Sequence, residues 1–153
     1  MRVRQKMRGT RTISEMSEQE AEFIATAIDC DGSIAKSGSE IRIVVGQRDS
    51  EIAVGLAERF GGTLYAGPVK GKPFYRWILG KRESKRQLLK KILPHLKIRY
   101  RQAKLALELF DILDSKKPDW KTERARILAE ISHLNSGLER TKVAISQLPG
   151  KID

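Results

Sequence analysis

The sequence predicts a single α+β domain in which an antiparallel sheet is covered by helices on one face. In some segments apolar residues recur every three to four positions, which is typical of helices with one buried face. In others, above all 40–47 and 74–79, apolar and polar residues alternate, which is typical of half-buried strands. The chain has 153 residues, 40% of them hydrophobic, enough for one domain with a real core.

The first half of the chain predicts a helix, two strands and a second helix. Ser17 with Glu20 forms a capping box, so the first helix is expected to begin there and to reach about Asp29. Strands follow at 33–36 and 40–47, joined by a Ser-Gly-Ser turn. The next helix is expected at 50–60, capped by Asp49 or Ser50 and closed by two glycines.

The second half predicts two more strands and then only helices. The strands are expected at 63–66 and 74–79, with a glycine- and proline-containing loop between them; the helices are expected at 83–93, 101–114, 120–134 and 138–148. We divide the chain into a flexible basic N-terminal arm, one folded domain and a short tail, with boundaries at 1–15, 16–148 and 149–153.

Positive charge is concentrated in two parts of the chain. The formal net charge is +11. Residues 1–12 hold five basic residues and no acid, and in residues 70–104 Glu83 is the only acid. Residues 13–69 are net negative. Because solubility does not require such segregation, it indicates a polyanionic partner, most simply nucleic acid.

The end of the first predicted helix carries two acids. Asp29 and Asp31 follow a compact apolar segment and precede Gly32. Carboxylates at a helix C-terminus meet the negative end of the helix dipole, at a cost of roughly 0.3–1 kcal/mol. We therefore expect a compensating cation, either a divalent metal or a partner's basic group.

Residues 24–32, Ile-Ala-Thr-Ala-Ile-Asp-Cys-Asp-Gly, resemble the LAGLIDADG motif of homing endonucleases. Gly-Ser-Ile follows the motif as is usual in that family, and Val-Gly-Gln ends the second strand where the family often has a polar residue. Residues 94–103 resemble the family's Leu-Lys-x-Lys-x-x-Gln-Ala segment, with Arg99 at a position where Lys is common. The resemblance spans about residues 16–115 and implies an αββαββα core with a DNA-binding sheet, followed here by extra C-terminal helices.

A single motif implies the intron-encoded, homodimeric class of that family. In this class the motif helices of two subunits pack together and bring one catalytic Asp from each to the centre, which suits a pseudo-palindromic DNA site. The expected dimer-interface residues are Ile24, Ala25, Ala27 and Ile28.

The resemblance also implies metal-dependent hydrolysis that leaves a staggered double-strand break. The expected cofactor is Mg²⁺ or another divalent ion such as Mn²⁺, because such ions take oxygen ligands and activate water. Asp31 is the expected metal ligand, with the backbone carbonyl of Cys30 as a second contact. Gln47 and Arg99 are expected beside the metal, where they would orient water or stabilise phosphate charge. Asp29 is assigned a structural role.

Double-stranded DNA is the expected partner, and basic residues are expected to bind it. Arg42, Arg48 and Arg76 are the candidates for reading guanine edges. The Lys and Arg residues of the 70–104 block and of the N-terminal arm would hold phosphates and set the salt dependence of binding. The full set of expected DNA-binding residues is Arg42, Arg48, Lys70, Lys72, Arg76, Lys97 and Arg101.

Three other functions stay open at this stage: an RNA-binding maturase that assists intron splicing on the same fold, a DNA-binding regulator without catalysis, and an unrelated basic ribosome-associated protein. The single cysteine allows no internal disulfide, which fits an intracellular setting, either a prokaryotic cytoplasm or an organelle. No apolar run reaches the roughly 18 residues of a membrane span, and no secretion signal or membrane partner is expected.

Overall fold

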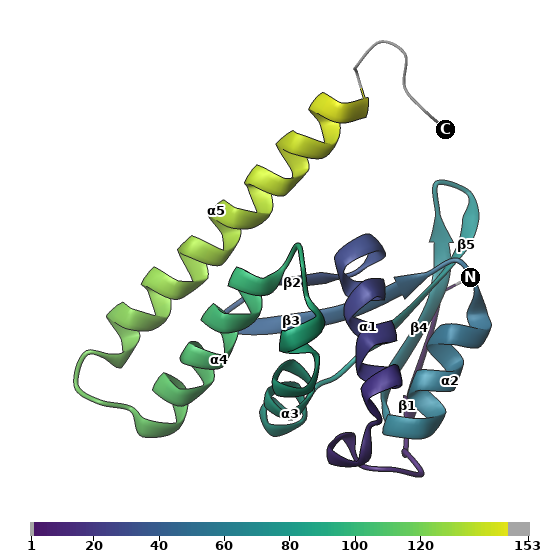
Figure 1. Ribbon diagram of the computed structural model, residues 1–153, viewed down its shortest axis with the longest axis horizontal. Coiled ribbons are helices and arrows are strands. Elements are labelled where there is room, and N and C mark those ends of the chain that lie inside the picture. Colours follow the sequence, from purple (N-terminus) through teal and green to yellow (C-terminus); the bar gives the residue numbers. More distant parts are fainter. Residues whose placement is uncertain (1, 147–153) are drawn as a thin grey trace.

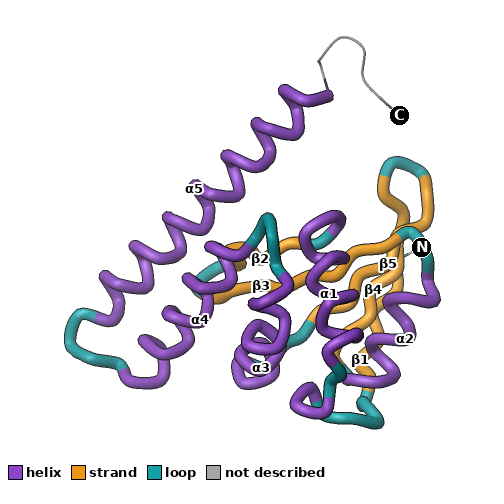
Figure 2. Tube along the Cα trace, in the orientation of Figure 1, coloured by secondary structure: helices purple, strands orange, loops and turns teal. Residues whose placement is uncertain are grey.

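An antiparallel sheet of five strands lies behind a layer of helices (Figures 1 and 2). The structure is a computed structural model that describes residues 2–146, with side chains through residue 138. The strands are β1 (Val3–Met7), β2 (Ser33–Ser37), β3 (Glu40–Gln47), β4 (Gly62–Val69) and β5 (Lys72–Ile78), in the spatial order β1-β4-β5-β3-β2. The helices are α1 (Glu18–Asp31), α2 (Ser50–Phe60), α3 (Arg82–Ile92), α4 (Tyr100–Ser115) and α5 (Trp120–Ser146), with 3₁₀ turns at Ile13–Glu15 and Leu93–His95.

The structure confirms the predicted fold class and the αββαββα order of the core. Helix α1 has the predicted capping box, in which the Ser17 hydroxyl accepts from the backbone of Glu20 and the Glu20 carboxylate accepts from that of Ser17. Asp49 caps α2 through the backbone N–H of Glu51. These local signals are read correctly because a cap depends on neighbours in sequence and not on the tertiary fold.

The N-terminal segment differs from the flexible arm expected at residues 1–15. Residues 3–7 form the edge strand β1, which pairs antiparallel with β4 from Val3 opposite Ala66 to Met7 opposite Gly62. In residues 3–7 cationic and other side chains alternate with the period of a strand. The positions on the open face carry arginine and lysine, and the pattern lacks the apolar residues that usually identify a strand. The charge therefore concealed a strand whose pairing partner lies some 60 residues further along the chain.

The expected loop between β4 and β5 is also shorter than predicted. Both strands continue to a two-residue turn at Lys70 and Gly71, whose φ values of 53° and 76° fit a type I′ hairpin. Pro68 and Pro73 lie opposite each other two pairs from the turn's centre. That pair exchanges no ladder hydrogen bonds, so a residue without an N–H is tolerated there. The hairpin tip projects from the body in Figure 1.

The last two predicted helices, 120–134 and 138–148, form the single helix α5 up to Ser146. The Asn-Ser-Gly sequence at 135–137 does not end it. Asn135 instead donates from Nδ2 to the carbonyl of Ile34 on the edge strand β2 (3.0 Å) and accepts from Gln102 of α4 (3.1 Å). A packed helix thus covers the β2 edge and satisfies one of its free carbonyls. The predicted end of that helix at 148 and the tail at 149–153 lie outside the described residues.

The core lies between the sheet and the helices. The alternating residues Ile41, Ile43 and Val45 of β3 are at most 1% exposed, as is Trp77 of β5. Each such side chain contributes roughly 1.5–3 kcal/mol on burial. The Trp77 indole donates to the carbonyl of Gly61 (2.7 Å), so its polar atom is satisfied too.

The four residues expected at a dimer interface belong to this core. Ile24, Ala25 and Ile28 are fully buried and Ala27 is 6% exposed, all within one chain. They line the side of α1 that packs on the sheet and on α3, so they offer no surface to a second copy, and that assignment is wrong. The periodicity had located the buried face of α1 correctly, but it does not distinguish burial in the subunit from burial between subunits.

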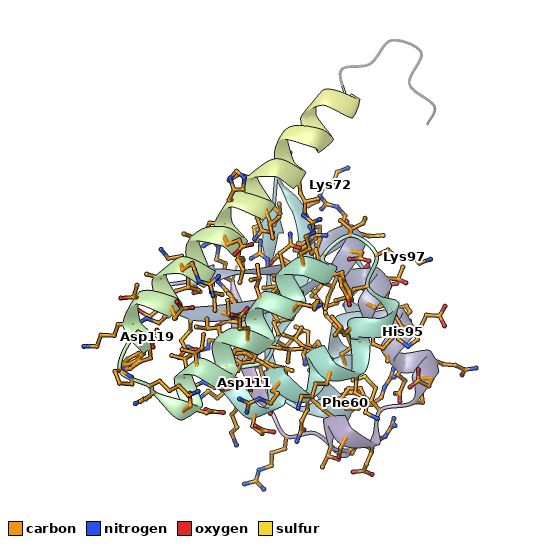
Figure 3. All side chains as sticks on the ribbon, turned by 60° about the vertical axis from the view of Figure 1, so that its left-hand side comes forward. Phe60, Lys72, His95, Lys97, Asp111 and Asp119 are labelled. Atoms are coloured by element: carbon orange, nitrogen blue, oxygen red, sulfur yellow. The ribbon has the colours of Figure 1, made fainter. Side chains whose placement is uncertain are left out.

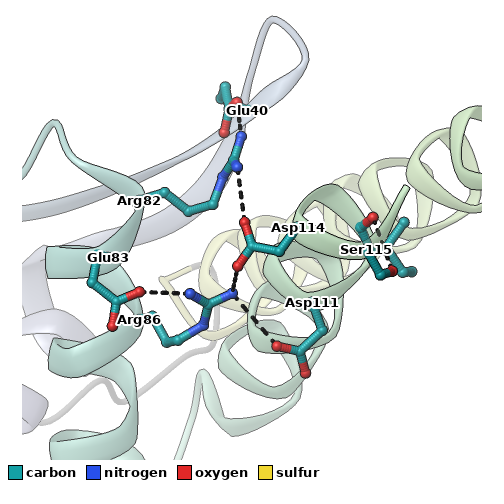
Figure 4. Close-up of polar contacts among 8 residues, drawn as sticks. Glu40, Arg82, Glu83, Arg86, Asp111, Asp114 and Ser115 are labelled. Atoms are coloured by element: carbon teal, nitrogen blue, oxygen red, sulfur yellow. Dashed lines mark hydrogen bonds and ion pairs between the residues drawn. The ribbon is translucent and has the colours of Figure 1, made fainter. Parts of the chain in front are cut away.

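An ion-pair cluster joins β3, α3 and α4 (Figure 4). Arg82 bridges Glu40 (3.2 Å) and Asp114 (3.1 Å). Arg86 contacts Asp114, Glu83 (2.6 Å) and Asp111 (3.5 Å). Two cations of the basic central block, Arg82 and Arg86, are therefore paired with acids of the same chain.

Candidate nucleic-acid interface and acidic helix end

The sheet face turned away from the helices carries arginines and aromatic rings. The strand register places Arg4 of β1 beside Tyr65 of β4, Tyr65 beside Arg76 of β5, and Arg76 beside Gly46 of β3. One row of residues thus crosses four strands, and every second residue along each strand shares this open face.

The guanidinium groups on this face stack on two rings. Arg4 and Arg42 lie over Tyr65, with 5.8 Å and 5.9 Å from Cζ to the ring centroid. Arg76 and Arg48 lie over Phe74, at 5.2 Å and 5.8 Å. Each exposed stack is worth about 0.5–1 kcal/mol and limits the motion of the fork, while its N–H edges stay accessible. Tyr65, Phe74 and Arg4 were not among the residues expected in this role from the sequence, although strand alternation places Phe74 on the same face as Arg76.

Asp31 ends α1 and opens onto this same face. Its exposed side chain lines a hollow together with Arg42, Arg76 and Phe74, and with residues of β2. The structure thus brings together the expected metal ligand and two of the expected DNA-binding arginines, although α1 and β5 are more than 40 residues apart in sequence. With Lys36 of β2, one carboxylate and three cations line this hollow, and such a set can bind a phosphate and direct an attacking group at it.

Two glycines allow the end of α1 to approach the sheet this closely. A Cβ on Gly32 would lie 2.3 Å from the carbonyl oxygen of Val44, and one on Gly46 would lie 2.7 Å from the Phe74 ring and 2.9 Å from the Asp31 carbonyl. Any larger residue would push the helix end away from β3. These glycines therefore set the position of Asp31 relative to the arginine-bearing strands.

Asp29 has a different environment from Asp31. It is 7% exposed, and its carboxylate accepts hydrogen bonds from the backbone N–H groups of Lys97 (2.8 Å) and Arg99 (3.0 Å). The Arg99 guanidinium donates to the Asp29 carbonyl at 2.6 Å and is itself buried. The cation that compensates this helix end therefore comes from the same chain, and Arg99 contacts the back of the helix end and not the hollow.

The other expected site residues are spread more widely. Gln47 is half-buried at the end of β3, paired with Tyr75, and lies outside the lining of the hollow. Lys70 and Lys72 are exposed at the hairpin tip. Lys97 and Arg101 are exposed near the start of α4. Figure 3 shows Lys72 and Lys97 on the upper part of the molecule, with Asp111 and Asp119 toward the lower α4–α5 end.

One chain supplies an incomplete set of metal ligands. Within the described residues, no group of three or more His, Cys, Asp or Glu is placed to hold a metal ion. Asp31 offers one exposed carboxylate, and the last carbonyls of α1 offer further oxygens of the kind that Mg²⁺ accepts. This set fits a divalent ion if a second carboxylate comes from another copy of the chain.

No protein-family model matches this sequence, and no curated protein matches it. Solved structures of the homing endonuclease I-CvuI do match. One complex with its target, in the presence of 2 mM Ca, has a TM-score of 0.57 at 21% identity and covers 76% of this chain and 82% of I-CvuI. Another, with the I-CreI target in 2 mM Mg and the DNA not cleaved, has a TM-score of 0.58 at 20% identity, covering 76% and 83%.

The chain has a homing-endonuclease fold. This likeness confirms the architecture that the sequence predicted, an antiparallel sheet with helices on one face. Because identity is near one residue in five, it concerns the arrangement of elements and not the chemistry of individual residues. Among the described helices, none is long and apolar enough to cross a membrane.

Proposed function

We propose that this protein is a site-specific, divalent-metal-dependent DNA endonuclease that acts as a homodimer on a long pseudo-palindromic site and leaves staggered ends. The observation that carries the proposal is the hollow at the end of α1, where the exposed carboxylate of Asp31 faces the arginines of an open sheet. The I-CvuI structures with the same fold are complexes with DNA, which supports the duplex as the partner.

The open sheet face binds the duplex in this proposal. A two-stranded β-ribbon can enter the major groove, and arginine is the residue best suited to read a guanine there. Arg42, Arg48 and Arg76 are exposed and pre-positioned by stacking, and one Arg48 N–H group also donates to the carbonyl of Pro73 (3.5 Å). Lys70, Lys72, Lys97 and Arg101 would bind phosphates, because they are exposed cations around this face and near the helix end.

Asp31 and the carbonyl of Cys30 would hold the metal. When bound, a divalent ion supplies an activated water and neutralises charge on the phosphate. The protein's own part is to fix the position of this carboxylate against the phosphate, through the glycine contacts and through Asp29. Arg99 acts as a positioning residue in this scheme because its guanidinium holds the helix end. Gln47 retains its proposed role of orienting water.

The dimer would form through the outer side of α1. Phe23 is 48% exposed, and Thr26 and Cys30 are exposed at the three-to-four spacing of one helix face. The Thr26 hydroxyl already donates to the carbonyl of Glu22 (3.0 Å), so an apolar contact there would leave no unsatisfied group. Two copies packed along this side would bring their Asp31 residues together and complete the ligand set that one chain lacks.

The test is cleavage of a randomised duplex library in Mg²⁺, with sequencing of the cut ends. Asp31→Asn keeps the shape of the side chain and removes its charge. Asp119→Asn makes the same change at an exposed position of the α4–α5 turn and serves as the control. We expect the wild type and Asp119→Asn to select and cut one pseudo-palindromic site, and Asp31→Asn to bind that site without cutting it.

If Asp31→Asn cut DNA at the wild-type rate, the assignment of Asp31 as the metal ligand would be wrong. If the folded wild type binds DNA or intron RNA but cuts nothing, the regulator or the maturase replaces the endonuclease. Light scattering of the protein–DNA complex tests the dimer, because a strict monomer on the site would contradict the two-fold arrangement.

A further inference from the structure

Strand β1 and the residue just before it, Arg2, present a row of three cations on the open sheet face. Arg2, Arg4 and Lys6 occupy alternate positions, and Arg4 and Lys6 lie in register beside Tyr65 and Thr63 of β4. Alternate residues of a strand are roughly 7 Å apart, at about 3.4 Å per residue. The row runs along the outer edge of the sheet, because β1 is the terminal strand on that side.

This strand buries little apolar surface. Val3 is 49% exposed, and of the β1 side chains only Met7 packs against the core. Ordering the backbone of five residues costs roughly 1–2 kcal/mol each, which the ladder with β4 must offset. Burial therefore does not explain the sequence of β1, whose open-face positions are all cationic.

The three cations are held apart from acids. Arg4 lies over the Tyr65 ring. The stem of Arg2 passes over Gly67, where an added Cβ would meet Arg2 Cγ at 3.0 Å. Arg2 and Arg4 line a hollow with Arg42 and Arg76. Among the described side chains, none of the three β1 cations has an ion-pair partner, so their charge is available to an anion.

We propose that β1 is a rail that binds one phosphate backbone of the duplex through Arg2, Arg4 and Lys6, and positions the inner strands without reading bases. The proposal rests on the DNA-binding function proposed above. Successive phosphates of one DNA strand lie further apart than the roughly 3.4 Å rise along the axis, because the backbone winds around it, so cations about 7 Å apart can meet successive phosphates. A row at the sheet's edge faces the rim of a groove, whereas Arg42 and Arg76 on the inner strands face its floor.

The test measures how salt weakens DNA binding in Ca²⁺, on the site selected in the cleavage experiment. The rail variant carries Arg2→Gln, Arg4→Gln and Lys6→Gln. The control variant carries Lys116→Gln, Lys117→Gln and Lys121→Gln, which removes the same charge near the α4–α5 turn, far from β1 in Figure 1. Three lost phosphate contacts in each of the two subunits reduce the salt slope by about 5.4, at about 0.9 per contact.

We expect wild-type binding to weaken about 1,800-fold more than that of the rail variant when salt rises from 50 to 200 mM. We expect the control to follow the wild type, and the base preference of the rail variant to be unchanged. Equal slopes for wild type and rail variant, or an equal loss in the control, would overturn the proposal. A preference lost at particular base pairs would show that β1 reads bases.

Arg4→Gln alone guards against detachment of the whole strand. It removes one contact per subunit, so wild-type binding should weaken about 12-fold more than that of this variant over the same salt range. Hydrogen exchange at Val3–Met7 reports whether β1 is paired in each variant. If the wild-type protein binds no DNA, the proposed function itself is refuted. If the wild type binds DNA and the rail variant shows the same salt dependence, only this inference is refuted.

Discussion

Arginines in two regions of this molecule have opposite surroundings. On the α3–α4 side, Arg82 and Arg86 are surrounded by four acids (Figure 4). On the open sheet face, Arg42 and Arg76 stack on aromatic rings and have no carboxylate within ion-pair distance among the described side chains. The same residue type thus stabilises the fold in one region and remains available for a ligand in the other.

The comparison teaches that cations paired with acids of the same chain must be separated from unpaired cations before the net charge is assigned a function. The basic block at 70–104 contributes to both regions, because Arg76 belongs to β5 and Arg86 to α3. An internal acid cancels much of the field of a paired cation, so the cations without such a partner contribute most to the attraction of a polyanion. Mutations in the two regions should therefore affect different measurements.

The largest expected effect is on stability, from Arg86→Ala. The Arg86 side chain is 13% exposed and contacts three acids, and these acids and hydrogen bonding hold its pKa above the usual value. Removing it leaves Glu83 and Asp111 without this partner and Asp114 with Arg82 alone, and should lower the free energy of unfolding by about 2–3 kcal/mol. Urea denaturation measures this loss. DNA affinity at a temperature where the variant is folded should not change. A matching loss of affinity would contradict the conclusion that the two regions have separate roles.

The next effect is on recognition, from Arg76→Ala. Loss of a bidentate guanine contact should cost about 1–3 kcal/mol at one position of each half-site and leave unfolding nearly unchanged. Competition binding against single-base variants of the site measures it. A uniform loss on all sequences would instead assign Arg76 to a phosphate, and Lys72→Gln is the comparison for that outcome.

The smallest effect is a pH dependence from a second self-paired cluster. Glu20 contacts Arg11 (2.8 Å) and Arg59 (3.0 Å), and hydrogen bonds led by Arg11 lower its pKa to about 2 from 4.5. Because the folded pKa is depressed, this stabilisation is present above pH 4.5 and is lost as pH falls toward 2. We expect a loss of roughly 1 kcal/mol, reduced by solvent screening. Glu20→Gln should flatten that part of the stability curve, and an unchanged curve would contradict the assignment.

Much of the fold could be predicted from the sequence because its signals are local. Caps, alternation and helical periodicity located α1, β3 and α2 nearly to the residue. The errors at β1 and α5 have the opposite origin. A cationic edge strand lacks an apolar pattern, and the Asn-Ser-Gly segment stays helical because Asn135 bonds to β2 and α4. No local signal indicates partners that lie so far away in the chain.

By itself, the sequence determined the fold class, the charge segregation and the two acids at the end of α1, since each follows from neighbouring residues and their periodicity. Tertiary structure alone decided which acid is available. The Asp29 carboxylate accepts hydrogen bonds from the backbone of the segment before α4, whereas Asp31 is exposed and lines a hollow with Arg42 and Arg76. It also decided that the apolar face of α1 is core. The physical reason is that burial and pairing depend on contacts between distant segments, which periodicity along one element does not specify.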